Sequence, residues 1–171
     1  FLLDDGRELR FVDARRFGRL WLLRPAEEDT YTGMAGLGPE PDDPALDAAY
    51  LRGACDKSRR AVKSCLLDQS VVAGIGNIYS DEILHTARIR PDRPACALSA
   101  EEWERLAEAI PRVMRFFTEK NLVTFEEYLQ SAGLEYRNTP WLRVYGHAGE
   151  ACGICGTALE RRVIGGRGSV F

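Results

Sequence analysis

The residues most suited to chemistry in this 171-residue chain are two thiols near its C-terminal end. Cys152 and Cys155 are separated by two residues and followed by a glycine. Thiolates at this spacing form one knuckle of a zinc ribbon, a site that needs four ligands. Sixteen residues follow Cys155, so a cysteine at the next position would fall inside the usual ribbon spacing. The pair predicts an incomplete zinc site, and the alternatives are completion by His147 or a segment without metal.

A second candidate is the glycine-containing turn between residues 69 and 79. Gly74 and Gly76 precede Asn77, near which a new helix is predicted to begin. Glycines let a backbone approach a ligand closely, and the free amides and positive dipole end of a helix favour a phosphate. Asn77 could cap this helix and also donate to a phosphate oxygen. A turn between two helices without a ligand is the alternative, because Gly-x-Gly alone is a weak signal.

A third candidate is the segment from Asp13 to Gly18. Arg15 and Phe17 are two residues apart, so in an extended segment they point to the same side. A guanidinium can hydrogen-bond an unpaired base, and an apolar ring can wedge into a base stack. The alternative is an exposed arginine-rich hairpin end with Phe17 in the core.

The charge distribution decides whether a nucleic acid is a reasonable partner. The net charge is −3, which by itself argues against one. Basic residues are nevertheless concentrated in residues 1–24, 57–68 and 132–171, and an acidic stretch at residues 26–56 offsets them in the sum. Phosphate binding needs a local basic patch and not a global excess.

Composition places the chain among ordinary globular proteins. No apolar run reaches the ~18 residues that a membrane span needs, and the chain opens without a basic leader. Cys55, Cys65 and Cys96 occur singly in helix-like contexts and are predicted to be buried thiols. The absence of a disulfide framework fits a cytoplasmic setting.

The elements that must position these groups predict an α+β fold. Residues 1–24 predict β-strands, with a hairpin around Asp5-Gly6 and a further strand over residues 18–23. Two or three strands cannot bury a sheet face alone, so a partner surface must come from elsewhere, and open strand edges could pair with a second copy. Residues 47–131 predict helices, and residues 141–171 predict short strands and turns.

The helical region carries its own start and stop signals. Ser99 to Glu102 is a capping box, followed by apolar residues at helical spacing from Trp103 to Phe117, which are assigned to the core. Pro111 interrupts this run and should kink the helix or begin a second segment. Thr124 to Glu127 is another capping box.

The stretch from Leu67 to Glu82 resembles the helix-two-turn-helix signature of the formamidopyrimidine-DNA glycosylase / endonuclease VIII family. The match is long and specific, and it includes Gly74, Gly76 and Tyr79. The resemblance implies that Asn77 binds the phosphate backbone around the lesion. It also implies that Lys63, on the preceding helix, lies near the DNA, and it places Lys63, Gly74, Gly76 and Tyr79 among the DNA-binding residues.

Two further segments carry the same resemblance. Asp13 to Gly18 is similar to the family's Asp-Pro-Arg-Arg-Phe-Gly loop, with Ala14 in place of proline. By this resemblance Arg15 faces the estranged cytosine and Phe17 is the wedge, and the wording favours the formamidopyrimidine branch over endonuclease VIII. Arg167 matches the arginine of the zinc hairpin that binds the phosphates flanking the lesion. Residues 131–139 correspond to the family's loop over the damaged purine, but residues 135–139 depart from its wording, so the resemblance does not specify the lesion.

The resemblance implies a domain order and an activity. Residues 1–36 would be a remnant of the β-sandwich, 37–46 a linker, 47–140 the helix-two-turn-helix domain, and 141–171 a truncated zinc-finger hairpin. The whole protein would be a monomeric bacterial DNA glycosylase and AP lyase, excising 8-oxoguanine and formamidopyrimidines from duplex DNA. Its partners would be double-stranded DNA with oxidised bases or abasic sites, and its cofactor zinc. The alternatives are a stand-alone damaged-DNA-binding module or an endonuclease VIII-type enzyme for oxidised pyrimidines.

Family members use an N-terminal proline as nucleophile, then a glutamate, then a lysine of a β-hairpin, and none of these matches a residue of this sequence. Borohydride trapping of the 171-residue chain on an 8-oxoguanine duplex is therefore expected to give no covalent adduct. An adduct on a denaturing gel would show that another amine acts as the nucleophile.

Overall fold

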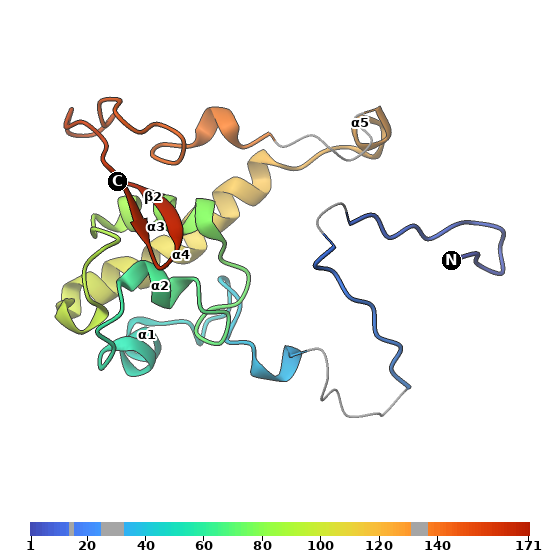
Figure 1. Cartoon of the computed structure of the whole chain (residues 1–171), viewed down its shortest axis with the longest axis horizontal. Coiled ribbons are helices and arrows are strands. Elements are labelled where there is room, and N and C mark those ends of the chain that lie inside the picture. Colours follow the sequence, from blue (N-terminus) through green and yellow to red (C-terminus); the bar gives the residue numbers. More distant parts are fainter. Residues whose placement is uncertain (14–15, 25–32, 131–136) are drawn as a thin grey trace. The chain divides into compact units, whose positions relative to one another are not determined.

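The computed structural model describes residues 1–13, 16–24, 33–130 and 137–171 of the chain. It divides into two compact units, Phe1–Ala35 and Gly36–Phe171, which are described separately below (Figure 1). Among the described residues, no helix is both long enough and apolar enough to cross a membrane.

The N-terminal unit contains little regular structure in its described residues. The predicted hairpin around Gly6 is present as a single antiparallel bridge between Leu2 and Glu8, and Gly6 adopts a φ of 80°. The predicted strand over residues 18–23 is wrong, because these residues are not in a strand. A strand needs a hydrogen-bonded neighbour, and the described residues of this unit supply none for that segment. The strand edges on which pairing with a second copy depended are therefore not formed here.

The second unit is a helical domain followed by a small β-hairpin (Figure 1). Helices α3 and α4 make the main packing contact, and α1 packs on α4. The core is formed by apolar side chains from these helices and from the turn before α3. The elements are α1 (Ala48–Cys55), α2 (Val62–Leu66), α3 (Asn77–Ala87), α4 (Ala100–Lys120), α5 (Phe125–Gln130), β1 (Arg161–Ile164) and β2 (Arg167–Val170).

Helix α4 begins as its sequence predicts. The Ser99 side chain accepts from the Glu102 amide and the Glu102 side chain accepts from the Ser99 amide, so the capping box is present. The apolar stripe from Trp103 to Phe117 is buried, as predicted. Pro111 does not begin a second segment, because α4 is one helix of 21 residues. Proline removes one backbone hydrogen bond, and the buried stripe on both sides of it holds the helix together.

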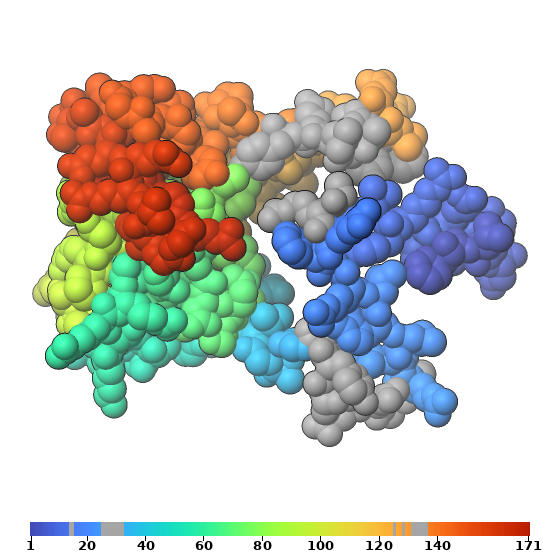
Figure 2. All heavy atoms as spheres, in the orientation of Figure 1, coloured from blue at the N-terminus to red at the C-terminus, as the bar shows by residue number. Residues whose placement is uncertain are grey.

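The β1–β2 hairpin is antiparallel, with Arg161 opposite Val170 and Ile164 opposite Arg167. Its two connecting residues, Gly165 and Gly166, have φ values of 56° and 76°, the positive range that a two-residue hairpin turn requires. A side chain at Gly165 would also meet the Ser64 hydroxyl at 2.6 Å, so the turn lies against α2. Figure 2 shows the hairpin, in red, on the surface beside the teal and green segment that carries α2.

Two predictions about the rest of this unit need correction. The sequence predicts a linker over residues 37–46, but this stretch is packed against the domain: Gly38 donates to the Gln69 carbonyl at 2.8 Å, and Leu46 lies in the core. Cys96 is exposed, whereas Cys55 and Cys65 are buried as predicted. Cys96 lies in the short 3₁₀ helix Ala95–Ala97, in which only Ala95 is buried.

Gly38 provides a test of this packing. An added Cβ would lie 2.5 Å from the Val71 carbonyl oxygen, a backbone atom that cannot move aside cheaply. Gly38→Ala is expected to lower the free energy of unfolding by about 1–3 kcal/mol in urea denaturation. Gly53→Ala is the matched control: Gly53 lies in α1 with open space around its Cβ position, so alanine should raise stability by up to about 1 kcal/mol. Equal effects of the two substitutions would contradict the packing of residue 38 on this turn.

Candidate nucleic-acid interface

The turn before α3 is held closed by the Gln69 side chain. Its Oε1 accepts from the Gly74 amide at 2.7 Å, and its Nε2 donates to the Ile75 carbonyl at 3.0 Å. Gly74 has a φ of 80°, a backbone conformation in which a side chain is strained. Gly74 and Gly76 are exposed while Ile75 between them is buried. Ile75 anchors the turn in the core, and the two glycines leave the outer surface of the turn without side chains.

Helix α3 begins one residue earlier than a cap at Asn77 would require. Gly76 is the N-cap, and because it has no side chain, no side-chain hydrogen bond closes the first turn. The first amides of α3 are therefore available to an external acceptor, with the positive end of the helix dipole behind them. Asn77 is the first helical residue, and its Nδ2 donates to the Gly168 carbonyl at 3.1 Å.

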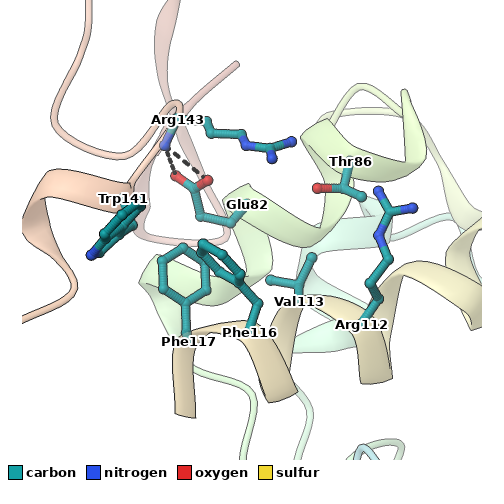
Figure 3. Close-up of a pocket in the computed structure, with 8 residues that line it drawn as sticks. All are labelled: Glu82, Thr86, Arg112, Val113, Phe116, Phe117, Trp141 and Arg143. Atoms are coloured by element: carbon teal, nitrogen blue, oxygen red, sulfur yellow. Dashed lines mark hydrogen bonds between the residues drawn. The ribbon is translucent and has the colours of Figure 1, made fainter. Parts of the chain in front are cut away.

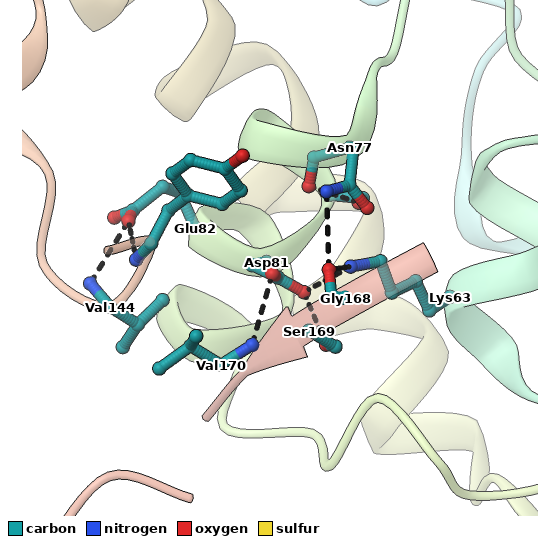
Figure 4. Close-up of polar contacts among 10 residues, drawn as sticks. Lys63, Asn77, Asp81, Glu82, Val144, Gly168, Ser169 and Val170 are labelled. Carbon is teal, nitrogen blue, oxygen red and sulfur yellow. Dashed lines mark hydrogen bonds and ion pairs between the residues drawn. The ribbon is translucent and has the colours of Figure 1, made fainter. Parts of the chain in front are cut away.

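Gly168 is the point at which the predicted site residues meet (Figure 4). Its carbonyl accepts from Asn77 and, at 3.2 Å, from the Lys63 ammonium. Arg167 is the preceding residue, at the start of β2, and its side chain is exposed. No hydrogen bond or ion pair of the Arg167 guanidinium is present among the described residues. Three predicted residues from distant parts of the chain thus lie at one place.

Lys63 differs from its predicted role as a residue that contacts DNA. Its side chain is 0% exposed, and its ammonium forms an ion pair with Asp81 at 2.7 Å. Burial lowers the pKa of Lys63, and the hydrogen bond to Asp81 works against that shift. A fully buried ammonium cannot touch a phosphate in this arrangement, so Lys63 acts inside the domain.

Asp81 on α3 is the partner that sequence reasoning did not single out. One carboxylate oxygen accepts from Lys63 and from the Ser169 hydroxyl at 2.5 Å, and the other accepts from the Val170 amide at 3.1 Å. The carboxylate therefore joins α2, α3 and β2 in the interior. A signal for it exists in the sequence, because Asp81 stands four residues after Asn77 and therefore on the same face of the helix.

Glu82 performs a similar task on the adjacent side of α3. It is 1% exposed, and its carboxylate accepts the amides of Arg143, Val144 and Tyr145, each at 3.0 Å. Hydrogen bonds to an ionised acceptor are roughly twice as strong as neutral ones. The turn that leads to the two cysteines is therefore fastened to α3 through its backbone.

The Tyr79 side chain is partly buried and contacts other residues of the domain. Its hydroxyl accepts from the Asn138 side-chain amide at 2.8 Å, and its ring lies 5.2 Å from that of Phe117. The ring is half-buried. Its contacts within the protein orient the first turn of α3.

The cysteine pair forms a knuckle next to α3. Gly156, with a φ of 74°, donates to the Cys152 carbonyl at 2.8 Å and closes the turn between the two thiols. Hydrogen bonds from Thr157 lower the pKa of the Cys155 thiol, and Cys152 adds to this effect. His85 Nε2 lies 3.4 Å from the Cys152 sulfur. The described residues contain no group of three side chains able to hold a metal ion.

The predicted void-filling loop belongs to the N-terminal unit. Arg15 lies outside the described residues, so its placement is not described. Phe17 is 76% exposed, and the Asp13 carboxylate accepts the amides of Arg16 and Gly18 at 3.0 and 2.5 Å. No described side chain of this unit is buried, so Phe17 shares its exposure with apolar residues such as Leu2, Val12 and Leu22.

A separate surface cavity of about 260 Å³ lies between α3 and α4 (Figure 3). The Glu82 carboxylate forms part of its wall while binding the Arg143 amide. Phe116 and Trp141 line it edge to face, with centroids 6.1 Å apart. None of the predicted DNA-binding residues lines this cavity.

Comparison with known proteins adds to this geometry. The family model described as the formamidopyrimidine-DNA glycosylase H2TH domain matches residues 37–126. Formamidopyrimidine-DNA glycosylase of Moorella thermoacetica is 47% identical over 161 residues, which cover 94% of this chain and 59% of that protein. The enzyme of the same name from Geobacillus kaustophilus is 43% identical, over 100% of this chain and 62% of its own length. The chain thus spans about three-fifths of these curated relatives.

Solved structures show the same likeness. The crystal structure of the MutM (Fpg) protein from Thermus thermophilus matches with a TM-score of 0.79 and 40% identity, over 93% of this chain and 60% of that one. Lactococcus lactis Fpg, in complex with DNA containing FAPY-dG, matches with a TM-score of 0.70 and 31% identity, over 80% and 49%.

Glu82 yields the prediction of this section. Glu82→Ala leaves one buried and two partly buried amides without an acceptor and is expected to lower the free energy of unfolding by about 3 kcal/mol or more. Glu82→Gln keeps one oxygen and removes the charge, so its expected cost is about 1–2 kcal/mol. Chemical denaturation measures both, with the exposed Glu104→Gln on α4 as the control. An alanine variant as stable as the glutamine variant would contradict the acceptor role.

Proposed function

Because the chain belongs to the formamidopyrimidine-DNA glycosylase family, we propose that it is the DNA-gripping part of a base-excision glycosylase and AP lyase that acts on oxidised purines in duplex DNA. The observation that carries this proposal is the hydrogen bond from Asn77 to the carbonyl of Gly168, the residue after exposed Arg167, beside the open N-terminus of α3. The Gly168 carbonyl thereby connects the Asn77 side chain, at the uncapped start of α3, to the strand residue that follows Arg167.

The geometry accounts for phosphate binding in elementary terms. The uncapped amides at the start of α3 and the helix dipole favour an anion, and exposed Gly76 presents no Cβ to obstruct its approach. The Asn77 side chain has a second amide hydrogen available beyond the one used by Gly168. The Arg167 guanidinium can bind a phosphate through two parallel hydrogen bonds. None of these contacts reads a base, so they hold the duplex without selecting its sequence.

The proposed substrate class comes from the relatives. The titles of solved neighbours describe Lactococcus lactis Fpg bound to DNA with FAPY-dG or an abasic site, and MutM bound to DNA with carbocyclic 8-oxo-G. These lesions are oxidised or ring-opened guanines and the product of their removal. We extend the same lesion class to the whole protein of which this chain would be a part.

Within this proposal, Arg15 and Phe17 fill the space left by the flipped nucleotide. The ring of Phe17 is exposed, as the wedge role requires. The Arg15 guanidinium, two residues earlier in the chain, would hydrogen-bond the base that has lost its partner.

Zinc is proposed as the cofactor of the C-terminal knuckle. Cys152 and Cys155 fit one half of a tetrahedral site, because the closed turn and the lowered pKa of Cys155 suit thiolate ligands. The described residues supply no third ligand, so a tetrahedral site would need two ligands from outside them. Bound zinc would stiffen the knuckle that leads into the hairpin. The phosphate contacts proposed above are made by Asn77, Arg167 and the backbone of α3.

The phosphate contacts can be tested by binding. Arg167→Ala is expected to weaken binding to a duplex with a tetrahydrofuran abasic analogue by about tenfold and to reduce the log–log salt slope by about one, since one phosphate contact is lost. Asn77→Ala should weaken binding as well, by a similar factor on two duplexes of unrelated sequence. Fluorescence anisotropy over a salt series gives both quantities.

Arg112→Ala is the matched control for these variants. It removes the same charge from an exposed position on α4, away from Gly168, and should leave the salt slope unchanged. Binding by the Arg167 and Asn77 variants that equals that of the unaltered chain would rule out the proposed interface.

A further inference from the structure

The three residues of β2 that follow Arg167 are held by directional hydrogen bonds. The residue after Arg167 receives two hydrogen bonds at its carbonyl, from Asn77 and Lys63. The next residue, Ser169, donates through its hydroxyl to Asp81, and Val170 donates to Asp81 through its amide. Three consecutive residues after Arg167 are therefore fixed by polar contacts to α2 and α3 (Figure 4).

The hairpin needs such an anchor, because it cannot define its own position. Its strands have four residues each, and a two-stranded hairpin is marginally stable alone. Apolar contact with the domain would hold it only loosely in register. A slide of the hairpin by two residues keeps the same face toward α3 but moves Arg167 by about 7 Å. Directional hydrogen bonds distinguish these registers, whereas apolar packing does so poorly.

We propose that Lys63 and Asp81 are positioning residues, which set the register of β2 on α3 and so hold Arg167 beside Asn77 for phosphate binding. This inference rests on the proposed function, since it concerns how the phosphate contact is aimed. Neither side chain touches DNA, because both are 0% exposed. Their effect on binding must pass through Gly168, Ser169 and Val170.

The chemistry of the pair separates positioning from stability. A buried ion pair often contributes little net stability, and replacing both partners by apolar residues of similar volume is frequently neutral or stabilising. Removing only one partner leaves an uncompensated buried charge, which would unfold the domain whether or not the pair positions Arg167. The informative variant is therefore the double replacement Lys63→Met with Asp81→Leu, made in the full 171-residue chain.

The double replacement is expected to fold, with a circular dichroism spectrum like that of the unaltered chain. It should nevertheless bind the tetrahydrofuran duplex about tenfold more weakly, with a salt slope lower by about one, as Arg167→Ala does. Placed in an Arg167→Ala background, it should add little further loss, because the group that it positions is gone. Arg52→Met with Asp56→Leu removes an exposed ion pair at the end of α1 and serves as the charge-matched control, with unchanged binding expected.

The outcomes separate this inference from the proposed function. If the unaltered chain shows no salt-dependent binding, or Arg167→Ala binds equally well, the proposed interface is wrong whatever Lys63 and Asp81 do. If Arg167→Ala weakens binding but the folded double replacement binds like the unaltered chain, only the positioning role is overturned. Additive losses in the Arg167→Ala background would also overturn it, since they would show that the pair affects binding independently of Arg167.

A milder variant decides the question if the double replacement does not fold. Ser169→Ala removes one hydrogen bond to Asp81 and leaves the ion pair with Lys63 in place. It should weaken binding by at least about twofold, and this loss should vanish in the Arg167→Ala background. Unchanged binding by Ser169→Ala would then refute the positioning role.

Discussion

The buried carboxylate of Asp81 is the contact on which the arrangement of the second unit depends. It accepts hydrogen bonds from the Lys63 ammonium, the Ser169 hydroxyl and the Val170 amide. An ionised group in the interior is costly unless its lone pairs are used and its charge is balanced. Asp81 meets both conditions only when α2, α3 and β2 are all in place, so its burial couples a hairpin to a helical domain.

Helix α3 extends this principle along its length. Asn77, Asp81 and His85 are spaced by four residues and so share one face. They contact Gly168, the Ser169–Val170 segment and Cys152, in that order along the helix. Glu82, on the neighbouring face, holds the amides of residues 143–145. A single helix therefore fixes both the start and the end of the C-terminal segment, through contacts between parts of the chain that are distant in sequence.

This organisation reconciles an acidic chain with the proposed phosphate-binding surface. The net charge of −3 is a sum over the chain, and it counts carboxylates such as Asp81 and Glu82 that are buried and engaged inside the domain. What the surface presents at the start of α3 is a set of uncapped amides, the Asn77 amide and the Arg167 guanidinium. The buried acids contribute to that surface indirectly, because they hold its donors in place.

The sequence by itself determined the local features of this protein. Capping residues around Ser99 and Thr124, the apolar stripe of α4, the glycine turn before α3 and the cysteine knuckle follow from interactions within a few residues, which a sequence displays directly. It also indicated Asn77 and Arg167 as phosphate ligands, and the hydrogen bond from Asn77 to Gly168, the residue after Arg167, agrees with that proposal. It misjudged the strand at residues 18–23 and the exposure of Cys96, because each depends on packing or on a pairing partner.

Only the tertiary structure decided what Lys63 and the acids of α3 do. A lysine in a basic stretch looks like a DNA contact, and nothing local distinguishes it from one whose partner is an aspartate eighteen residues away. The contacts of Asp81 and Glu82 with the C-terminal segment cross 61 to 89 residues of sequence, so no spacing rule reports them. Burial of a charge is a property of the assembled domain, and it becomes favourable only once the distant donors have converged on it.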